Sequence, residues 1–178
     1  NPEHPNVPAG GTMPIPVTAF RKDGFDGTID VALEGLPAGL KATTGVIMPN
    51  QIATTVLLTA DESAKLETAA PLKVLGRAQA GSETLAHYAN PDDNLKLIAL
   101  MPKPDIIMTA QTKEVTLEAG GSSAEVLVSI LRQNGFGGRV PVAVRNLPPR
   151  VRVPDVGLNG ELITAEQTQR SFTIKALP

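Results

Sequence analysis

The strongest constraint on the fold of this chain is an internal repeat. Residues 21–37 have the sequence RKDGFDGTIDVALEGLP, and residues 132–148 have the sequence RQNGFGGRVPVAVRNLP. At an offset of 111 residues, eight of these 17 positions are identical. The identical pairs are Arg21/Arg132, Gly24/Gly135, Phe25/Phe136, Gly27/Gly138, Val31/Val142, Ala32/Ala143, Leu36/Leu147 and Pro37/Pro148. The repeat predicts two copies of one module, which we place at residues 1–93 and 94–178.

Apolar and polar residues alternate inside both copies, for example in residues 29–33 and 140–144. A period of two is typical of strands with one buried face. Similar segments recur at roughly the 8–12-residue spacing of sandwiches and barrels, with Gly, Pro or Asn between them. The one helical candidate is DESAKL at residues 61–66, where Asp61 could cap a turn or two. The pattern therefore predicts an all-β fold.

Three prolines mark predicted sheet edges. Pro14 and Pro16 lie two positions apart in one strand, so both missing N–H groups fall on the same side of it, which predicts an edge strand or a strand whose start is unpaired. Pro141 makes the same prediction for a strand of the second copy. Proline at an exposed edge also prevents unwanted strand pairing between molecules.

Composition excludes several classes of function. The 178 residues contain no cysteine and carry a formal net charge of −2, so disulfides and thiolate chemistry are absent. A sequence pI near 5.7 argues against nucleic acid as the main partner. No apolar run approaches the roughly 18 residues that a membrane-spanning helix needs.

Candidates for catalysis are few. The two histidines are His4, in a proline-rich segment, and His87, in a predicted strand, and no G-x-S-x-G motif accompanies them. The glycines of GFGG at residues 135–138 precede a strand, whereas a phosphate-binding loop precedes a helix. We therefore expect a protein that is not an enzyme.

Calcium is the most serious ligand hypothesis, because hard cations bind several carboxylate and carbonyl oxygens. Asp23, Asp26 and Asp30 are close together in KDGFDGTID, and Asp92 and Asp93 lie where the two modules join. The second copy has no acid at the three positions that match the first cluster. Solvated turn acids therefore stand as the alternative to calcium ligands at Asp23, Asp26, Asp92 and Asp93.

The order of these motifs resembles immunoglobulin-like modules of large bacterial extracytoplasmic proteins. The resemblance rests on GLPAG at Gly35–Gly39, a strand at Thr54–Ala60, a strand at Pro71–Gly76, and a family-specific hairpin expected at Asp155–Thr164. It implies two tandem immunoglobulin-like β-sandwich modules and a periplasmic, cell-surface or secreted location. Its motifs are turn and core patterns, which identify a fold better than an activity.

The two copies differ at their ends. The second copy has a predicted strand pair before its Gly-Gly pair, Ile106–Ala110 and Glu114–Glu118, and the first has only NPEHPNVPA there. The first copy continues past Ala60 with predicted strands at 71–79 and 83–88, where the second stops. We therefore expect a first module whose first strand is lacking or irregular. We expect a second module without its final strands, which is frayed or borrows a strand from a neighbour in a longer protein.

These observations predict a non-enzymatic structural spacer or interaction scaffold within a larger extracytoplasmic bacterial protein, with neighbouring domains of that protein as its partners. The alternatives are a ligand-binding module, for a polysaccharide or a protein and with assistance from calcium, or an accessory domain of a secreted hydrolase. Only five of the 178 residues are aromatic, and none is tryptophan, so aromatic platforms for sugar stacking are scarce.

Overall fold

The computed structural model describes residues 5–89, 97–154 and 161–178, and within these ranges the chain is all-β, with strands and turns but no helix. It divides into two compact units, Asn1–Pro104 and Asp105–Pro178. We describe each unit by itself.

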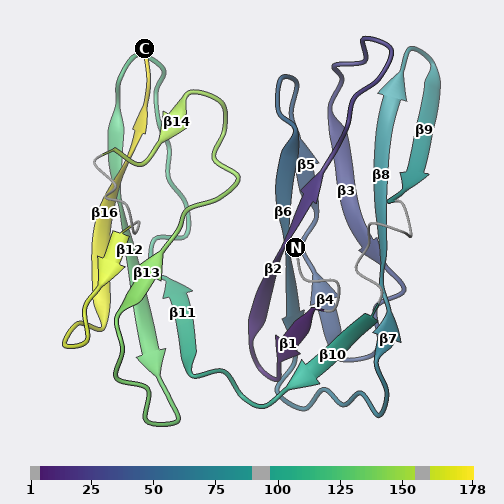
Figure 1. Ribbon diagram of the computed structural model, residues 1–178. Helices are drawn as coiled ribbons and strands as arrows, with labels where there is room; N and C mark the ends of the chain where they lie inside the picture. Colours follow the sequence, from purple (N-terminus) through teal and green to yellow (C-terminus); the bar gives the residue numbers. More distant parts are fainter. Residues whose placement is uncertain (1–4, 90–96, 155–160) are drawn as a thin grey trace. The chain divides into compact units, whose positions relative to one another are not determined.

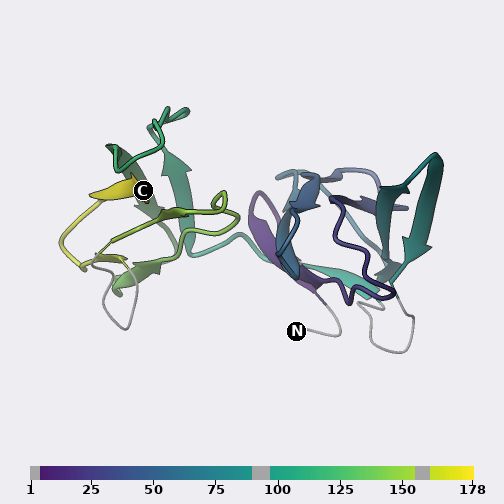
Figure 2. The ribbon, with the colours of Figure 1, turned by 90° about the horizontal axis from the view of Figure 1, so that it is seen from above.

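Unit 1 contains the first ten strands. They are β1 (Asn6–Pro8), β2 (Thr12–Thr18), β3 (Ile29–Glu34), β4 (Leu40–Ala42), β5 (Gly45–Ile47), β6 (Ala53–Ala60), β7 (Ala70–Pro71), β8 (Lys73–Ala80), β9 (Glu83–Tyr88) and β10 (Leu97–Met101). They form sheets in the order β2-β6-β4, β5-β3-β8-β9 and β1-β10-β7. Strands β8 and β9 lie on the opposite side of the unit from β2 (Figures 1 and 2).

The first two sheets of unit 1 contribute to one apolar core. Its buried members come from every strand of those sheets except β9, from β1 and β10, and from Leu72 between β7 and β8. They are Val7, Ile15, Val31, Leu33, Leu40, Ile47, Val56, Leu58, Ala60, Leu72, Val74 and Ile98. The alternating residues of β3 and β6 supply inward-facing side chains, as the period of two predicts.

The described residues of unit 2 form six strands. They are β11 (Ile106–Ala110), β12 (Ser123–Arg132), β13 (Val140–Val142), β14 (Val151–Arg152), β15 (Glu161–Ile163) and β16 (Gln169–Ala176). They form sheets in the order β11-β12-β16-β14 and β13-β15. Seven residues, none more than 8% exposed, form its core: Val126, Val128, Ile130, Val140, Val142, Ile163 and Phe172.

The sheet orders extend the sequence repeat. The order β2-β6-β4 of unit 1 corresponds to β12-β16-β14 of unit 2, and β5-β3 corresponds to β15-β13. Strands β2 and β3 match β12 and β13 at an offset of 111 residues, and β5 and β6 match β15 and β16 at 116. Within the described residues, β11 has no counterpart in unit 1, and β8 and β9 have none in unit 2.

The prolines explain where the two units differ. Within the described residues, strand β2 pairs only with β6. The Ala19 N–H donates to the Ile52 carbonyl (2.8 Å), and because bonded and non-bonded pairs alternate along the ladder, the nitrogens of Pro14 and Pro16 face away from β6. The side of β2 that faces away from β6 corresponds to the side of β12 on which β11 pairs. The prediction of an edge strand is confirmed, and the missing N–H groups give a physical reason why β2 has no such partner.

Pro141 has the same relation to β13. Within the described residues β13 pairs only with β15, through Val140, Pro141 and Val142. A proline between two paired residues is accommodated when its nitrogen faces away from the partner strand. The corresponding strand β3 has β8 on that side.

Three sequence-based predictions differ from the structure. The boundary expected at 93/94 falls after Pro104 instead, because β10 pairs with β1 and β7, and Lys103 forms an ion pair with Glu62 of the same unit. Residues 61–66 form a turn and no helix: the Ala64 N–H donates to the Asp61 carbonyl (3.0 Å), and the Asp61 carboxylate pairs with Lys41, 2.9 Å away.

The third difference is the strand predicted at Glu114–Glu118, which does not form. The Leu127 N–H donates to the Thr112 hydroxyl (3.0 Å), and the Leu127 carbonyl accepts from the Gln111 and Thr112 N–H groups. These bonds use the backbone groups that a longer ladder along β12 would need. Of the hairpin expected at Asp155–Thr164, residues 155–160 lie outside the described residues, and the rest includes β15.

Candidate functional site

The repeated motif forms a tight turn in both units. In unit 2 the Phe136 N–H donates to the Gln133 carbonyl (2.9 Å) across Asn134 and Gly135, whose φ angles are 50° and 74°. Positive φ at both central residues is the signature of a type I′ turn, which Asn-Gly and Asp-Gly favour. In unit 1 the same turn contains Asp23 (φ 55°) and Gly24 (φ 74°). Both copies therefore form the same turn, and Gly24 and Gly135 supply its second residue with positive φ.

The second glycine of the motif makes room for the phenylalanine ring. A Cβ atom at Gly138 would lie 2.7 Å from Cζ of Phe136, and one at Gly27 would lie 2.6 Å from Cζ of Phe25. Real Cβ atoms essentially never approach another heavy atom so closely. Phe136 also packs against the core of unit 2. The Phe and Gly of the motif are therefore one packing unit, which explains why both copies contain them.

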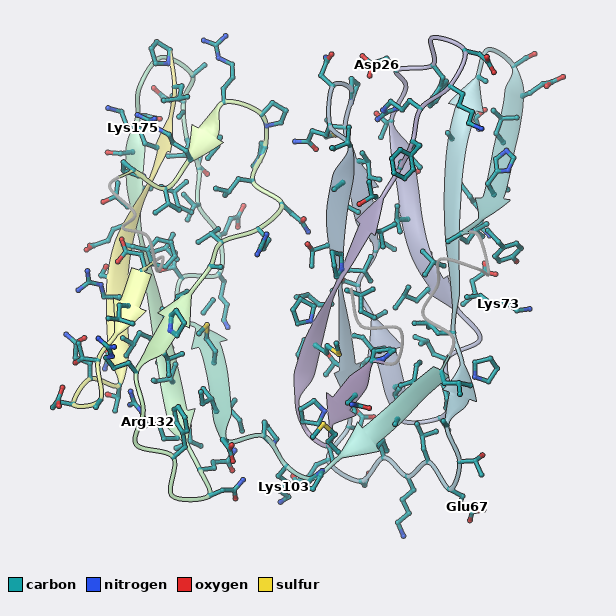
Figure 3. The ribbon with its side chains drawn as sticks, viewed as in Figure 1. Asp26, Glu67, Lys73, Lys103, Arg132 and Lys175 are labelled. Carbon is teal, nitrogen blue, oxygen red and sulfur yellow. The ribbon has the colours of Figure 1, made fainter. Side chains whose placement is uncertain are left out.

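The arginine that opens the motif binds backbone carbonyls. Arg132 donates through Nη1 to the carbonyl of Gln167 (2.6 Å), through Nη2 to that of Thr164 (2.6 Å), and through Nε and Nη2 to that of Gly138 (both 3.3 Å). Figure 3 labels Arg132 at this end of unit 2. The guanidinium thus ties the turn before β13 to the segment between β15 and β16.

Arg21 does the same in unit 1. Its guanidinium donates to the carbonyls of Gly27 (2.5 Å), Met48 (2.9 Å) and Gln51 (3.3 Å). We call each arginine, with the turn and the carbonyls that it holds, the arginine brace of its unit. Sequence reasoning assigned no role to Arg21 or Arg132, although their identity across the repeat was the signal that could have found them.

The calcium candidates of unit 1 lie beside this brace. The Asp26 Oδ1 atom accepts a hydrogen bond from the Asn50 N–H (2.9 Å) and lies 3.8 Å from Nε of Arg21. Figure 3 labels Asp26 at this turn. Asp23 is an exposed turn residue. A calcium ion would have to share the Asp26 carboxylate with a guanidinium, which is unfavourable for a cation.

The other two calcium candidates belong to the sequence where the two modules were predicted to join. Asp92 and Asp93 lie outside the described residues. Within the described ranges, no group of three or more His, Asp or Glu side chains is close enough together to hold a metal ion. Calcium assistance therefore stays a prediction.

A polar and aromatic cluster covers the outer face of the sheet β5-β3-β8-β9. The Tyr88 hydroxyl donates to Oε2 of Glu34 (2.8 Å), and Nη2 of Arg77 donates to Oε1 of the same carboxylate (3.1 Å). The Lys73 ammonium lies 5.9 Å from the centroid of the Tyr88 ring. The hydrogen bond to Glu34 raises the pKa of Tyr88 above its ordinary value, because the neutral phenol is the donor.

We call Glu34, Lys73, Arg77 and Tyr88 the tyrosine face. Tyr88 is 58% exposed, whereas Leu75, its cross-strand neighbour on β8, is 3% exposed. His87, the histidine considered for catalysis, is an exposed residue of edge strand β9, and His4 lies outside the described residues.

Comparisons with protein-family models and with curated proteins find no match to this sequence. In the part of the chain that the structure describes, no helix has the length and apolar character needed to cross a membrane.

Proposed function

We propose that this chain is a non-enzymatic structural spacer or interaction scaffold of a larger extracytoplasmic bacterial protein. In this proposal the two units are tandem immunoglobulin-like β-sandwich modules, and their partners are the neighbouring domains of the parent protein. The observation that carries the proposal is the role of the residues that the two copies share.

The shared residues serve folding. Arg132 holds carbonyls, Gly135 permits the turn, Phe136 and Gly138 pack on each other, and Val142 is buried in the core. Two copies of a binding or catalytic module would be expected to share exposed polar side chains as well. Among the eight identical positions the only charged one is the arginine, and its guanidinium is engaged by backbone carbonyls.

The edges of the sheets support the same role. Pro14, Pro16 and Pro141 remove N–H groups from the open sides of β2 and β13, which limits uncontrolled pairing between molecules. The absence of cysteine makes folding independent of redox conditions. A string of such units sets a distance between other parts of a protein.

A melting-temperature screen tests this proposal. The whole chain is heated with calcium, with EDTA and with a panel of soluble polysaccharides. A specific ligand at 100 times its dissociation constant adds about 2.7 kcal/mol, which shifts a unit of this size by roughly 4 °C or more per kcal/mol. A spacer gives a flat screen, and a clear shift with any ligand contradicts the spacer role.

The tyrosine face favours a second candidate, a module that binds a polysaccharide or a protein. An exposed ring beside fixed carboxylate, guanidinium and ammonium groups offers both stacking and hydrogen bonding. If a ligand shifts the melting temperature, the variant Tyr88→Ala removes the ring, and the shift should disappear with it. A shift that survives in Tyr88→Ala would place the ligand elsewhere, for example at a calcium-dependent site.

An accessory domain of a secreted hydrolase remains a third proposal. Its catalytic residues would belong to another part of the parent protein. A catalytic domain found next to these modules in the parent protein would favour it over a spacer.

A further inference from the structure

The edge strands of the two units are not equally protected. Strand β2 carries two prolines and β13 carries one, and each points to the open side. In the part of the chain that the structure describes, strand β11 ends the sheet β11-β12-β16-β14 (Figure 1). Its sequence, Ile-Ile-Met-Thr-Ala, contains no proline, no charge and no glycine. Natural edge strands use proline and charged side chains to prevent pairing, so β11 is an unprotected edge.

The hydrogen bonds at both ends of β11 show which of its backbone N–H and C=O groups point away from β12. The Gln133 N–H donates to the Asp105 carbonyl, and the Gln111 N–H donates to the Leu127 carbonyl, both at 2.8 Å. Bonded and non-bonded pairs alternate along an antiparallel ladder. Ile107 and Thr109 therefore bond to β12, whereas Ile106, Met108 and Ala110 direct their N–H and C=O groups to the open side, away from β12.

These three residues are symmetric about Met108. If a second β11 runs antiparallel along the open side, Met108 faces Met108 of the other copy and Ile106 faces Ala110. Every outward N–H group of one strand then meets an outward C=O group of the other, so each copy donates three hydrogen bonds and accepts three. No charged side chains of β11 oppose each other in this arrangement.

The side chains near this edge are exposed and apolar. Met108 is 43% exposed, Ile107 is 37% exposed, and Leu131, the neighbour of Ile107 on β12, is 59% exposed. Burial of such surface favours association. The outer neighbours Thr109 and Ser129 are polar but uncharged, so they would not repel a second copy.

We propose that the open side of β11 pairs with β11 of a second copy of this chain, in the antiparallel register centred on Met108. The pairing makes one continuous sheet from the four-stranded sheets of two molecules, with twofold symmetry. Two five-residue strands bury less than the roughly 1,200 Å² of a standard interface, so the dimer is weak and reversible. This proposal does not depend on the spacer role.

Strand β9 provides a matched control, because among the described strands it is the other edge strand of more than four residues that lacks proline. The Ala89 N–H donates to the Val74 carbonyl (2.8 Å), so Ala86 directs its N–H away from β8 by the same alternation. Unlike β11, β9 carries Glu83, and its Tyr88 is hydrogen-bonded to Glu34. Ala86→Pro therefore removes an outward N–H group from an edge that is already protected, as Met108→Pro does from the unprotected edge β11.

The experiment is sedimentation velocity of the whole chain from micromolar to millimolar concentration, for the wild type, Met108→Pro and Ala86→Pro. Neither proline removes an N–H group that bonds within the sheet. We expect a concentration-dependent dimer for the wild type and Ala86→Pro, and association weakened at least about tenfold in Met108→Pro because two central hydrogen bonds are lost. A monomer throughout, or equal dimerisation in Met108→Pro, overturns the proposal.

Amide hydrogen exchange supplies a measurement that does not rely on a variant. In the monomer the Thr109 amide is protected by β12, and the Met108 and Ala110 amides exchange fast. Raising the protein concentration should slow exchange at Met108 and Ala110 and leave Thr109 unchanged. Exchange at Met108 that stays fast while the chain dimerises would place the contact at another surface.

Discussion

Gly138→Ala tests the packing of the repeated motif more sharply than any other single change. The added Cβ atom would lie 2.7 Å from Cζ and 3.1 Å from Cε2 of Phe136. Gly138 does not have a positive φ angle, so the backbone itself accepts alanine. The ring must therefore move from its place against the core of unit 2, and forced repacking of this kind costs about 1–3 kcal/mol.

That cost predicts a drop of roughly 4 °C or more in the melting temperature of unit 2, since 1 kcal/mol shifts a domain of 60–100 residues by about 4–8 °C. Calorimetry or far-UV circular dichroism measures it. Gly137→Ala is the control, because a Cβ atom there would meet nothing within 4 Å, and it should be neutral or slightly stabilising.

A double-mutant cycle then assigns the effect to the ring. In a Phe136→Ala background the added methyl group has no ring to displace, so Gly138→Ala should cost much less than in the wild type. If Gly138→Ala melts with the wild type, or costs the same with and without the ring, the packing account of the motif is wrong.

Three further predictions address the core, the brace and the tyrosine face. Val142→Asp should unfold unit 2, because it buries an unpaired charge at a residue that is only 6% exposed. Arg139 is exposed, so Arg139→Asp should leave unit 2 folded. Equal melting temperatures of the two variants would mean that the inward face of β13 is misassigned. Arg132→Lys should lower the free energy of unfolding, measured in urea, by about 1–3 kcal/mol, because an ammonium group cannot reach the carbonyls of Gly138, Thr164 and Gln167 together. An unchanged free energy would show that the arginine brace does not stabilise unit 2. Tyr88 is the only tyrosine, so the absorbance of tyrosinate reports its ionisation alone. The midpoint of its titration should lie above the ordinary tyrosine pKa of about 10, and Glu34→Gln should lower that midpoint. Because the pKa of Tyr88 is raised in the folded state, its hydrogen bond to Glu34 stabilises the folded state fully at pH values below the pKa of the unfolded chain. This contribution is lost as the pH rises through the pKa of the folded state. A titration midpoint that Glu34→Gln leaves unchanged would refute the contact.

Much of the fold was predictable because it depends on local patterns. Strand β11 has the bounds that the sequence predicts, Ile106–Ala110, and the prolines of β2 identify an edge. Where prediction failed, a non-local contact decided the outcome. The sequence Glu114–Glu118 alternates like a strand, but Thr112 has already taken the backbone N–H of Leu127 with its hydroxyl. No periodicity within residues 114–118 contains that information.

The same reason limits what could be predicted of the candidate site. The turn at Gly24 follows from Asp-Gly chemistry alone, whereas the role of Arg21 depends on the carbonyls of Met48 and Gln51, which are distant in sequence. The acid cluster suggested calcium from the sequence. The fold instead places Asp26 against a guanidinium and the Asn50 N–H.

Each unit of the chain is held by its own core and its own arginine brace. The most direct test compares the ¹H–¹⁵N spectrum of residues 105–178 alone with that of the whole chain. The account predicts a dispersed spectrum that superimposes on the unit 2 signals of the whole chain, except near Asp105. A collapsed spectrum would show that the seven core residues of unit 2 do not suffice, and would contradict the claim.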